Sequence, residues 1–365
     1  MKCLCDSGFN GVMFFPAAES DYTDATFSPE AHVMSSAELP PRTGAPRDAR
    51  DGRFRNRQRI ARSGSFWRWQ WDRWRARHAG AGRGAVPDLP VADALPQVWR
   101  PGPEPVVTWV GHATVLVQAG GLNVLTDPIF SERASPLPFL GPRRLVPAAP
   151  GLDRLPRIDA VLLSHNHYDH LDLPTLRALA RQGGGAPTFF APLGLHDWLL
   201  RRGIGPVIGL DWWQHARLGA ARMHLVPAQH WSRRSLRDIN RTLWGGWVAE
   251  WADFRFLFTG DTAYCDEFKA IGEHFGGIDL AAIPIGAYEP RWFMRAQHVN
   301  PDEAVRILQD TRSRQGLAIH WGTFHLTDEP LDEPPRKLLE ALRARQLPTS
   351  RFWILQHGET RLVRP

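Results

Sequence analysis

The chain has 365 residues, a formal net charge of +6 at pH 7, 43% hydrophobic residues and 22% charged residues. This composition is typical of a folded globular protein and excludes overall disorder, while the basic excess favours an acidic partner. No apolar run approaches the roughly 18–20 residues of a membrane-spanning helix, and the N-terminus lacks the apolar stretch of a signal peptide. Three cysteines, Cys3, Cys5 and Cys265, are too few for a disulfide framework, so we expect a cytoplasmic protein.

The first 103 residues divide into two segments by pattern. Residues 1–50 show neither strand nor helix periodicity and are predicted to be a mobile extension. Residues 51–103 are predicted to be a basic aromatic arm, because arginines alternate with tryptophans in "SFWRWQWDRWRARH". In a helix, Trp67, Trp71 and Trp74 would share one face, as in helices that lie on a membrane surface.

Two other interpretations of this arm follow from the same residues. The tryptophans can pack on the main domain, and packing is compatible with membrane contact. Arginine and aromatic residues also occur together in nucleic-acid-binding tracts, but no nucleic-acid-binding motif accompanies them here, so we expect no nucleic-acid partner.

Residues 104–365 are predicted to form a layered α/β domain, because short β-like runs alternate with helical patterns. "PVVTWVGHATVLVQAGGLNVLTDP" predicts two strands around a turn at Gly120 and Gly121. A helix is expected after Asp172 as N-cap, and another after Asn300, with Glu303 closing a capping box. Further strands are expected in "IDAVLLSH", "RMHLVPAQH", "FRFLFTGD", "LAAIPIG" and "GLAIHW".

A dense cluster of metal-binding residue types follows one of these strands. "VLLSHNHYDHLD" places His165, His167, Asp169 and His170 in the loop that leads to the first helix. Imidazole and carboxylate ligands suit Zn²⁺, although iron and manganese accept them too. A structural zinc site usually uses thiolates, which this loop lacks, so the cluster predicts a catalytic metal site with a position open for water.

Three more candidate ligands stand at the ends of other predicted strands. They are His230 in "VPAQHWS", Asp261 in "LFTGDTAY" and His320 in "LAIHWGTF". Active sites of layered α/β folds gather at such strand ends. With the loop cluster they make five histidines and two aspartates, enough for two zinc ions about 3.5–4 Å apart with one carboxylate and one hydroxide between them.

The motifs of the chain resemble those of a known family. "SHNHYDH" matches the HxHxDH signature of the metallo-β-lactamase superfamily. The wider set, in order along the chain from about Asp51, resembles N-acylphosphatidylethanolamine-hydrolysing phospholipase D. It comprises "TWVGHATVLV", "LTDPIFSERASP", "GPRRL", "PLGLHDW", "LDWWQ", "PAQHWSRR", "LWGGW", "GDTAYC", "AAIPIGAYEPRWFM", "QHVNPDEAVRI" and "AIHWGTF".

The resemblance implies a four-layer αβ/βα sandwich with a dinuclear zinc site at one edge of its two sheets. It implies as ligands His165, His167 and His230 for the first ion, Asp169, His170 and His320 for the second, and Asp261 bridging both. Asp127 in "LTDP" and His112 in "VGHAT" resemble residues that orient ligands, whereas a turn-forming aspartate and a buried histidine would have the same appearance. Gln297 and His298 in "RAQHVNP" would lie near the substrate phosphate, and a homodimer is implied.

The reaction expected from this resemblance is hydrolysis of N-acylphosphatidylethanolamine, or a related phospholipid, to N-acylethanolamine and phosphatidate. We hypothesise that a metal-bridging hydroxide attacks phosphorus on the side opposite the N-acylethanolamine oxygen, which leaves, and that a zinc-bound water or the Asp261 carboxylate passes the proton. The alternative is another substrate for the same metal centre, a lactone, a β-lactam or a soluble phosphodiester, because the superfamily reuses its ligands. A membrane- or nucleic-acid-binding protein without activity would need a broken ligand set, and all seven positions are filled.

A bilayer substrate requires contact with a membrane surface, so we expect a peripherally membrane-associated protein. The arm is one candidate for that contact. The apolar segments "IFSERASPLPFLGP" and "YEPRWFM" are two others, with ordinary packing as their alternative explanation.

Overall fold

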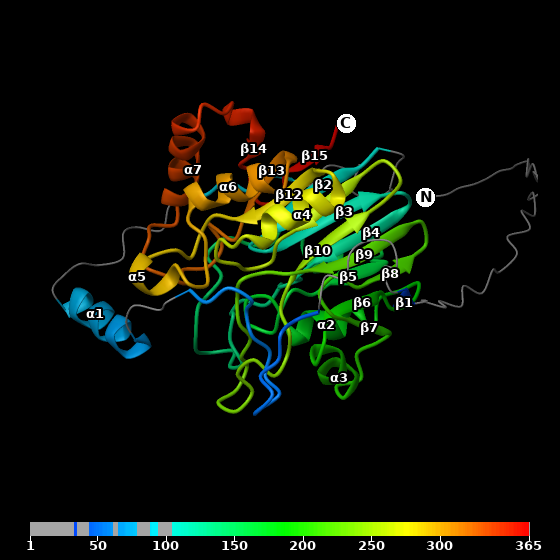
Figure 1. Cartoon of the computed structure of the whole chain (residues 1–365), viewed down its shortest axis with the longest axis horizontal. Helices are drawn as coiled ribbons and strands as arrows, with labels where there is room; N and C mark the ends of the chain where they lie inside the picture. Colours follow the sequence, from blue (N-terminus) through cyan, green and yellow to red (C-terminus); the bar gives the residue numbers. More distant parts are fainter. Residues whose placement is uncertain (1–32, 35–43, 61–64, 79–87, 94–103, 365) are drawn as a thin grey trace, which may run out of the picture. The chain divides into compact units, whose positions relative to one another are not determined.

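The computed structural model describes residues 33–34, 44–60, 65–78, 88–93 and 104–364. Over these residues the chain forms two mixed β-sheets that face one another, with helices on their outer faces (Figure 1). Most of the predicted mobile extension, residues 1–50, lies outside the described residues. The α/β sandwich predicted from the sequence is confirmed.

The first sheet has seven strands in the order β15-β2-β3-β4-β5-β6-β7. Its strands are β2 (Val106–Gly111), β3 (Thr114–Ala119), β4 (Leu122–Thr126), β5 (Ala160–Leu162), β6 (Thr188–Pro192), β7 (Val207–Leu210) and β15 (Thr360–Leu362). From β4 to β7 neighbouring strands run parallel, which brings the carboxyl ends of β4, β5 and β6 to one edge.

The second sheet has eight strands in the order β1-β8-β9-β10-β11-β12-β13-β14. Its strands are β1 (Val33–Met34), β8 (His215–Leu218), β9 (Ala221–Val226), β10 (Gly246–Glu250), β11 (Arg255–Phe258), β12 (Ile278–Pro284), β13 (Ser313–Ile319) and β14 (Phe352–Trp353). Strands β11 to β14 are parallel, so the carboxyl ends of β11, β12 and β13 also share an edge.

The helices are α1 (Phe66–His78), α2 (Leu173–Leu179), α3 (Leu195–Leu200), α4 (Glu267–Phe275), α5 (Arg291–Met294), α6 (Pro301–Asp310) and α7 (Glu333–Ala344), with 3₁₀ turns η2 (Leu152–Arg154) and η3 (Thr349–Arg351). Helix α6 contacts β12, β13 and α7, and α3 contacts β6 and β7 on the other sheet. Figure 1 shows α6 and α7 on one side of the paired sheets and α2 and α3 on the other. None of the helices in the described part of the chain is long and apolar enough to span a bilayer.

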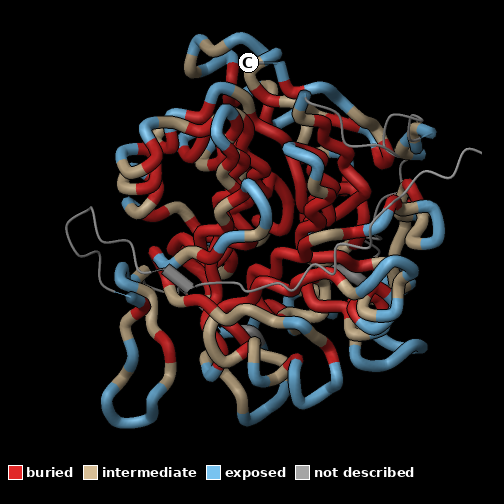
Figure 2. Tube along the Cα trace, turned by 90° about the vertical axis from the view of Figure 1, so that its right-hand side faces the viewer, coloured by how far each residue is buried: buried red, intermediate tan, exposed pale blue. Residues whose placement is uncertain are grey.

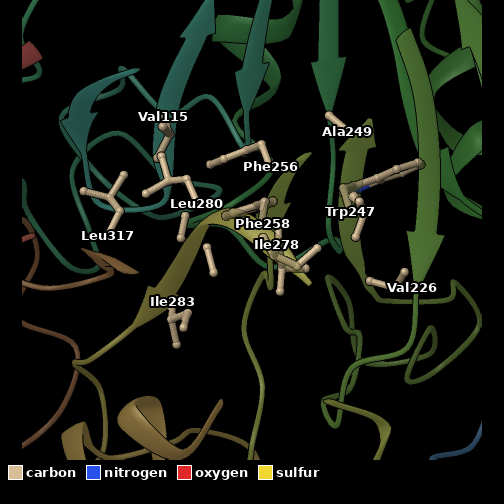
Figure 3. Close-up of a cluster of buried hydrophobic side chains, with 14 of the residues drawn as sticks. Val115, Val226, Trp247, Ala249, Phe256, Phe258, Ile278, Leu280, Ile283 and Leu317 are labelled. Atoms are coloured by element: carbon tan, nitrogen blue, oxygen red, sulfur yellow. The ribbon is translucent and has the colours of Figure 1, made fainter. Parts of the chain in front are cut away.

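The sheets pack through a core that is rich in aromatic residues. Trp247, Phe256 and Phe258 of the second sheet lie in one cluster with Val115 of the first (Figure 3). Successive residues of strands β2 to β6 in the first sheet alternate between this cluster and a second one under α2 and α3, so these strands are buried on both faces (Figure 2). Double burial explains why these strands are continuous apolar runs rather than alternating patterns.

Local signals were borne out to different degrees. Asn300 caps α6, and its side chain and that of Glu303 form the predicted capping box. Asp172 occupies the N-cap position of α2 but makes no capping hydrogen bond, because its carboxylate accepts from Ser131 and Thr175 instead. The sequence predicted two strands around the turn at Gly120, and the structure has three. The chain also turns at His112, which splits the first predicted strand into β2 and β3.

The segment 44–60 packs on the α/β body. Ala45 and Phe54 belong to the main core cluster, and Phe54 N donates to Asn240 O at 2.9 Å. Gln229 donates through Nε2 to the carbonyl of Gln58 at 2.9 Å. We call this segment the strap, because it runs across the loop that follows β9.

Glu250 provides a test of how charge contributes to stability. Its Oε2 lies 3.1 Å from His224 Nε2 and its Oε1 accepts from Arg255 Nε at 3.1 Å. The bond with His224, helped by Arg255, outweighs burial and lowers the pKa of Glu250 from 4.5 to about 2. The resulting stabilisation is present above pH 4.5 and is lost as the pH falls toward 2.

We therefore expect Glu250→Gln to lower the free energy of unfolding by about 1–2 kcal/mol at pH 7. The difference from the wild type should shrink below pH 4.5 and vanish near pH 2. Urea titrations across this range measure it, with Glu340→Gln, which changes an exposed carboxylate on α7, as the control. An equal effect of Glu250→Gln at all pH values would contradict the explanation.

Candidate metal centre

The candidate metal ligands and the two orienting candidates, His112 and Asp127, lie after strand ends on the edge where the two sheets meet. Each follows a strand because the parallel strands of both sheets deliver their carboxyl ends to this edge. The residues and the strands they follow are His112 after β2, Asp127 after β4, His165, His167, Asp169 and His170 after β5, His230 after β9, Asp261 after β11 and His320 after β13.

Three histidines form the first group. His167 Nδ1 lies 2.8 Å from His165 Nε2 and 3.2 Å from His230 Nε2. The other nitrogens of His165 and His230 are already used, because His165 Nδ1 is 2.8 Å from Ser164 Oγ and His230 Nδ1 donates to the carbonyl of Gln297 at 2.9 Å. Three nitrogen lone pairs therefore point at one place, and nitrogens bound to one tetrahedral zinc ion lie about 3.4 Å apart.

The second group joins one carboxylate to two imidazoles. Asp169 Oδ2 lies 3.6 Å from His170 Nε2 and 3.4 Å from His320 Nε2. His170 Nδ1 donates to Asp127 Oδ2 at 2.7 Å, which leaves its Nε2 free of a proton in the neutral ring.

Asp261 lies between the two groups. Its Oδ2 is 3.0 Å from His170 Nε2 and 3.9 Å from both His165 Nε2 and His230 Nε2, and its Oδ1 is 3.2 Å from His320 Nε2. One carboxylate thus reaches members of both groups.

Several polar atoms of this cluster are buried and make no hydrogen bond within the described part of the chain. They are Asp261 Oδ1, His167 Nε2, His170 Nε2, His298 Nδ1 and both ring nitrogens of His320. Buried polar atoms without partners are costly, so such a concentration indicates a ligand that would pair with them. The donor set of imidazoles and carboxylates fits divalent metal ions.

The electrostatics of the cluster favour a cation. Burial lowers the pKa of His167 to about 3 and that of His230 to about 4, so both rings are neutral and able to ligate. Burial opposes ionisation of Asp261, but the neighbouring His170 and His320 hold its pKa well below its usual range. Burial also lowers the pKa of His320, yet Asp261 and Asp169 outweigh it and raise that pKa to about 9, which shows how strongly the carboxylates attract positive charge.

Asp127 and His112 both contact side chains of the candidate ligands. Asp127 accepts from Ser164 and His170, and His112 Nε2 lies 3.2 Å from Asp169 Oδ2. His112, Asp127 and His320 all have positive φ angles, of 53°, 28° and 60°. Non-glycine residues seldom adopt this strained conformation, and it is concentrated at functional sites.

Gly260 allows two of the site loops to approach each other. Its φ is +60°, and a Cβ there would lie 2.7 Å from the Cβ of Ser164 and 3.0 Å from the carbonyl of Gly245. Because Gly260 precedes Asp261 and Ser164 precedes His165, a side chain at this position would push the two loops apart.

The side chain of His298 lies in the cluster of candidate ligands, whereas that of Gln297 contacts Met294. His298 joins the cluster, with Nδ1 3.9 Å from Asp261 Oδ2 and its ring next to that of His230. Gln297 contributes its backbone carbonyl to His230, while its side-chain amide donates to the sulfur of Met294 at 3.7 Å.

Arg234 is a contributor to the site that sequence reasoning missed. Its partly buried guanidinium donates to the carbonyls of Asn166 and Leu171 at 3.0 and 2.8 Å and stacks on Tyr168, so it holds both ends of the loop that carries His167, Asp169 and His170. The arginine pair in "HWSRRS" marks a positive charge near a predicted ligand, but no sequence signal shows which of the two arginines contacts the loop.

Asn56 of the strap is a second missed contributor. Its Nδ2 donates to the carbonyl of His230 at 2.8 Å, and its Oδ1 accepts from the backbone N–H of His230 at 3.2 Å and from Trp244 Nε1 at 3.1 Å. The amide therefore fixes the backbone of His230 from both sides. The sequence contains no signal for this contact, because it joins residues 174 positions apart.

We expect Asn56→Asp to lower hydrolytic activity about 10- to 100-fold, since it replaces a donor to His230 by an acceptor and residues that support metal ligands have effects of this size. The rate and the bound metal per chain should be measured together. Gln309→Glu makes the same chemical change on the exposed face of α6 and should leave both unchanged. Wild-type activity in Asn56→Asp would show that the strap does not position His230.

Comparison with known proteins relates this site to a family. The sequence model of the Beta-lactamase superfamily domain matches residues 122–321. The chain is 44% identical over 264 residues to N-acyl-phosphatidylethanolamine-hydrolyzing phospholipase D 1 of Caenorhabditis elegans, covering 69% of this chain and 74% of that one. It is 37% identical over 238 residues to the mitochondrial N-acyl-phosphatidylethanolamine-hydrolyzing phospholipase D of Saccharomyces cerevisiae, covering 63% and 50%.

Solved structures support the fold. The metallo hydrolase Igni18 of Ignicoccus hospitalis superimposes with a TM-score of 0.53 at 20% identity, covering 70% of this chain and 97% of that one. At this identity the likeness concerns the fold alone. Fold, matched family model and close relatives agree, and the chain is a metal-dependent hydrolase that belongs to the N-acyl-phosphatidylethanolamine-hydrolysing phospholipase D family of the β-lactamase superfamily.

Proposed function

We propose that the protein is a dinuclear zinc phosphodiesterase. The observation that carries the proposal is that two groups of buried ligand atoms share one carboxylate, Asp261. His165, His167 and His230 would hold the first ion, Asp169, His170 and His320 the second, and Asp261 both. When bound, two zinc ions supply a water of lowered pKa and neutralise negative charge on phosphoryl oxygens.

The protein's own groups prepare this centre before metal or substrate arrives. Asp127 holds the proton of His170 at Nδ1, and the Gln297 carbonyl holds that of His230 at Nδ1, so each ring presents Nε2 to a metal ion. Ser164 performs the same task for His165. These hydrogen bonds orient the three rings before a metal ion binds, and such preorganisation preserves affinity and geometry.

His298 is the residue that we assign to the substrate. Its Nδ1 is buried, makes no hydrogen bond within the described residues and faces the same space as Asp261. It can therefore hydrogen-bond a phosphate oxygen held at the centre. Gln297 would act through its backbone on His230, with its side chain next to Met294, so we give it a positioning part.

We propose N-acylphosphatidylethanolamine or a related phospholipid as the substrate, with N-acylethanolamine and phosphatidate as products. The support is the similarity to two relatives that carry this activity in their names. A homodimer and a cytoplasmic location, which the sequence led us to expect, complete the proposal; Cys265, buried and without a disulfide, is compatible with that location.

We further propose that α1 places the enzyme on a membrane surface. Trp69 is 7% exposed, stacks on Phe293 of α5 and donates through Nε1 to Asp328 at 2.7 Å, so it fixes the helix to the α/β body. Trp67, Trp71 and Trp74 are 79%, 56% and 50% exposed. A helix anchored by one tryptophan and presenting three others suits insertion at the level of lipid headgroups.

The loop between β4 and β5 would add to this contact. Phe139 is 75% exposed and Leu140 is 61% exposed. The segment "YEPRWFM", the other apolar candidate, is covered instead, because Phe293 lies under Trp69 and Arg68 stacks on Trp292.

Hydrolysis of defined substrates tests the proposed reaction. The zinc-loaded protein should be incubated with N-acylphosphatidylethanolamine in mixed micelles, with products identified by mass spectrometry and metal content measured by elemental analysis. We expect N-acylethanolamine and phosphatidate in equal amounts and two metal ions per chain. Rapid opening of lactones or β-lactams without release of N-acylethanolamine would refute the phospholipase assignment while leaving the metal centre intact.

A further inference from the structure

A cavity separate from the metal centre opens beside the strap. Its volume is about 390 Å³, and no proposed metal ligand lines it. The lining comes from the strap, from the loop after Asp261, from the turn that follows α5, and from α6. The residues are Gln58, Arg59, Ile60, Tyr264, Arg295, Glu303 and Arg306.

Two of its three arginines have no internal partner. The guanidinium groups of Arg59 and Arg295 belong to exposed residues and make no ion pair or hydrogen bond with any residue that the structure describes. Exposed arginines are common on protein surfaces, but these two line one concave space, where their fields add.

The single carboxylate of the lining is already neutralised. Glu303 receives two hydrogen bonds from Arg291 Nη2, at 3.0 and 2.8 Å, and one from the backbone N–H of Asn300 at 3.1 Å. It therefore offers little to compensate Arg59 and Arg295, and the cavity has an excess of positive charge.

The third arginine is held in a fixed orientation. The guanidinium of Arg306 stacks on the ring of Tyr264, 3.7 Å from its centre, and Arg306 Nε lies 3.7 Å from Asp310 Oδ2. The hydroxyl of Tyr264 donates to the same carboxylate, so Asp310 is shared between two partners. Stacking leaves the edge of the planar guanidinium available for a further acceptor.

We propose that this cavity binds a phosphate group, and that the group belongs to the headgroup of an anionic phospholipid. Guanidinium groups match phosphate oxygens in pairs, and several of them around one space form the usual receptor for phosphate. A lipid is the favoured source of the phosphate because of the position of α5. This helix ends one residue before Arg295, and its Phe293 stacks on Trp69 of α1, the helix that exposes three other tryptophans. The lipid source rests on the proposed membrane function, whereas the phosphate site does not.

A ligand in this cavity would touch three segments that lead to the metal centre. The strap fixes His230 through Asn56, Tyr264 follows Asp261 by three residues, and Arg295 precedes Gln297, whose carbonyl holds His230. The headgroup would therefore bind next to the substrate site without occupying it, and binding would order the segments that support His230.

Titration of the metal-loaded full-length protein with inorganic phosphate tests the site. The double variant Arg59→Gln/Arg295→Gln removes the two unpaired guanidiniums. Arg154→Gln/Arg181→Gln makes the same charge change at two exposed positions elsewhere and is the matched control. Phosphate can also bind the metal centre, so we expect two classes of site in the wild type and the control. In the Arg59/Arg295 variant the cavity class should weaken at least about tenfold.

Flotation with vesicles separates the two sources of phosphate. Phosphatidylcholine vesicles with phosphatidylglycerol should bind the Arg59/Arg295 variant about tenfold more weakly than the control, and pure phosphatidylcholine vesicles should bind both alike. Identical phosphate isotherms in the two variants would overturn the site. Loss of the phosphate site with unchanged vesicle binding would overturn the headgroup and assign a soluble phosphorylated ligand.

Hydrolysis provides the remaining control. Both double variants should hydrolyse a soluble phosphodiester at the wild-type rate, since neither changes the metal centre. Failure of the proposed phosphodiesterase activity would appear in the wild type itself and would not alter the comparison of phosphate isotherms, so the two proposals fail separately.

Discussion

Asp261→Asn is expected to reduce phosphodiester hydrolysis by about a thousandfold or more, because this carboxylate would bridge both metal ions and carry the charge that holds them together. In the structure it is the one carboxylate with atoms within 3.9 Å of both the His165 and the His320 side chains among the described residues. The amide keeps the shape but loses the charge. Rate and metal content should therefore fall together, with fewer than two ions bound per chain.

Asp279→Asn is the matched control. Asp279 also lies on the second sheet, and it accepts a hydrogen bond from the backbone of Arg255 at 2.8 Å far from the metal centre. We expect the activity and metal content of the Asp279→Asn variant to equal those of the wild type. Full metal content in Asp261→Asn with normal hydrolysis would refute the bridging assignment; vesicle binding should be unchanged in both variants, since neither alters α1.

Replacing Trp67, Trp71 and Trp74 together by Ser is expected to weaken binding to phospholipid vesicles about 100-fold. Each exposed indole would bury roughly 100 Å² at the lipid interface, and apolar burial stabilises by about 25 cal/mol per Å². Only part of this free energy contributes to the binding affinity, because association also costs translational and side-chain entropy. Vesicle flotation measures the effect, as does a surface-binding assay whose signal does not depend on tryptophan fluorescence. Activity toward a soluble phosphodiester should stay at the wild-type level, because Trp69 keeps the helix in place.

Leu362→Ser removes an exposed apolar side chain from β15 and serves as the control that should bind vesicles normally. Vesicle binding by the triple tryptophan variant at wild-type strength would refute the docking role of α1. A truncation of residues 1–85 would be a poorer test, because it also removes Asn56 and so disturbs His230.

The arm contains one buried and three exposed tryptophans. The alternation of arginine and tryptophan predicted membrane contact, packing on the main domain, or both. In the structure Trp69 is buried against α5 and Asp328, and the three tryptophans predicted to share a face are the exposed ones. The helical period of 3.6 separates position 69 from the others, which explains this division.

Much of the fold and of the candidate site follows from local sequence patterns. The capping box of α6 is encoded in four consecutive residues, and the runs before His165, Asp261 and His320 are apolar enough to be recognised as buried strands. Parallel strands deliver their carboxyl ends to one edge, so the candidate ligands were expected to meet there. The motifs also indicated the family, which the comparisons confirm.

The contacts that support the site depended on residues distant in the sequence. Asn56 reaches His230 across 174 positions, and the turn at His112, which splits one predicted strand into two, brings that ring to Asp169. The cationic cavity likewise combines Arg59, Arg295 and Arg306 from three segments.

The sequence by itself therefore determined the chemistry of this protein: the residue types of a metal hydrolase, their placement at strand ends, and the family. Only the tertiary structure decided which tryptophans are exposed, which residues hold the ligand rings, and where unpaired arginines gather. The physical reason is the sequence separation over which each interaction acts. Capping and strand patterning act over a few residues. Burial, hydrogen bonds to the backbone of a ligand residue and clusters of like charge depend instead on which distant segments the two sheets bring together.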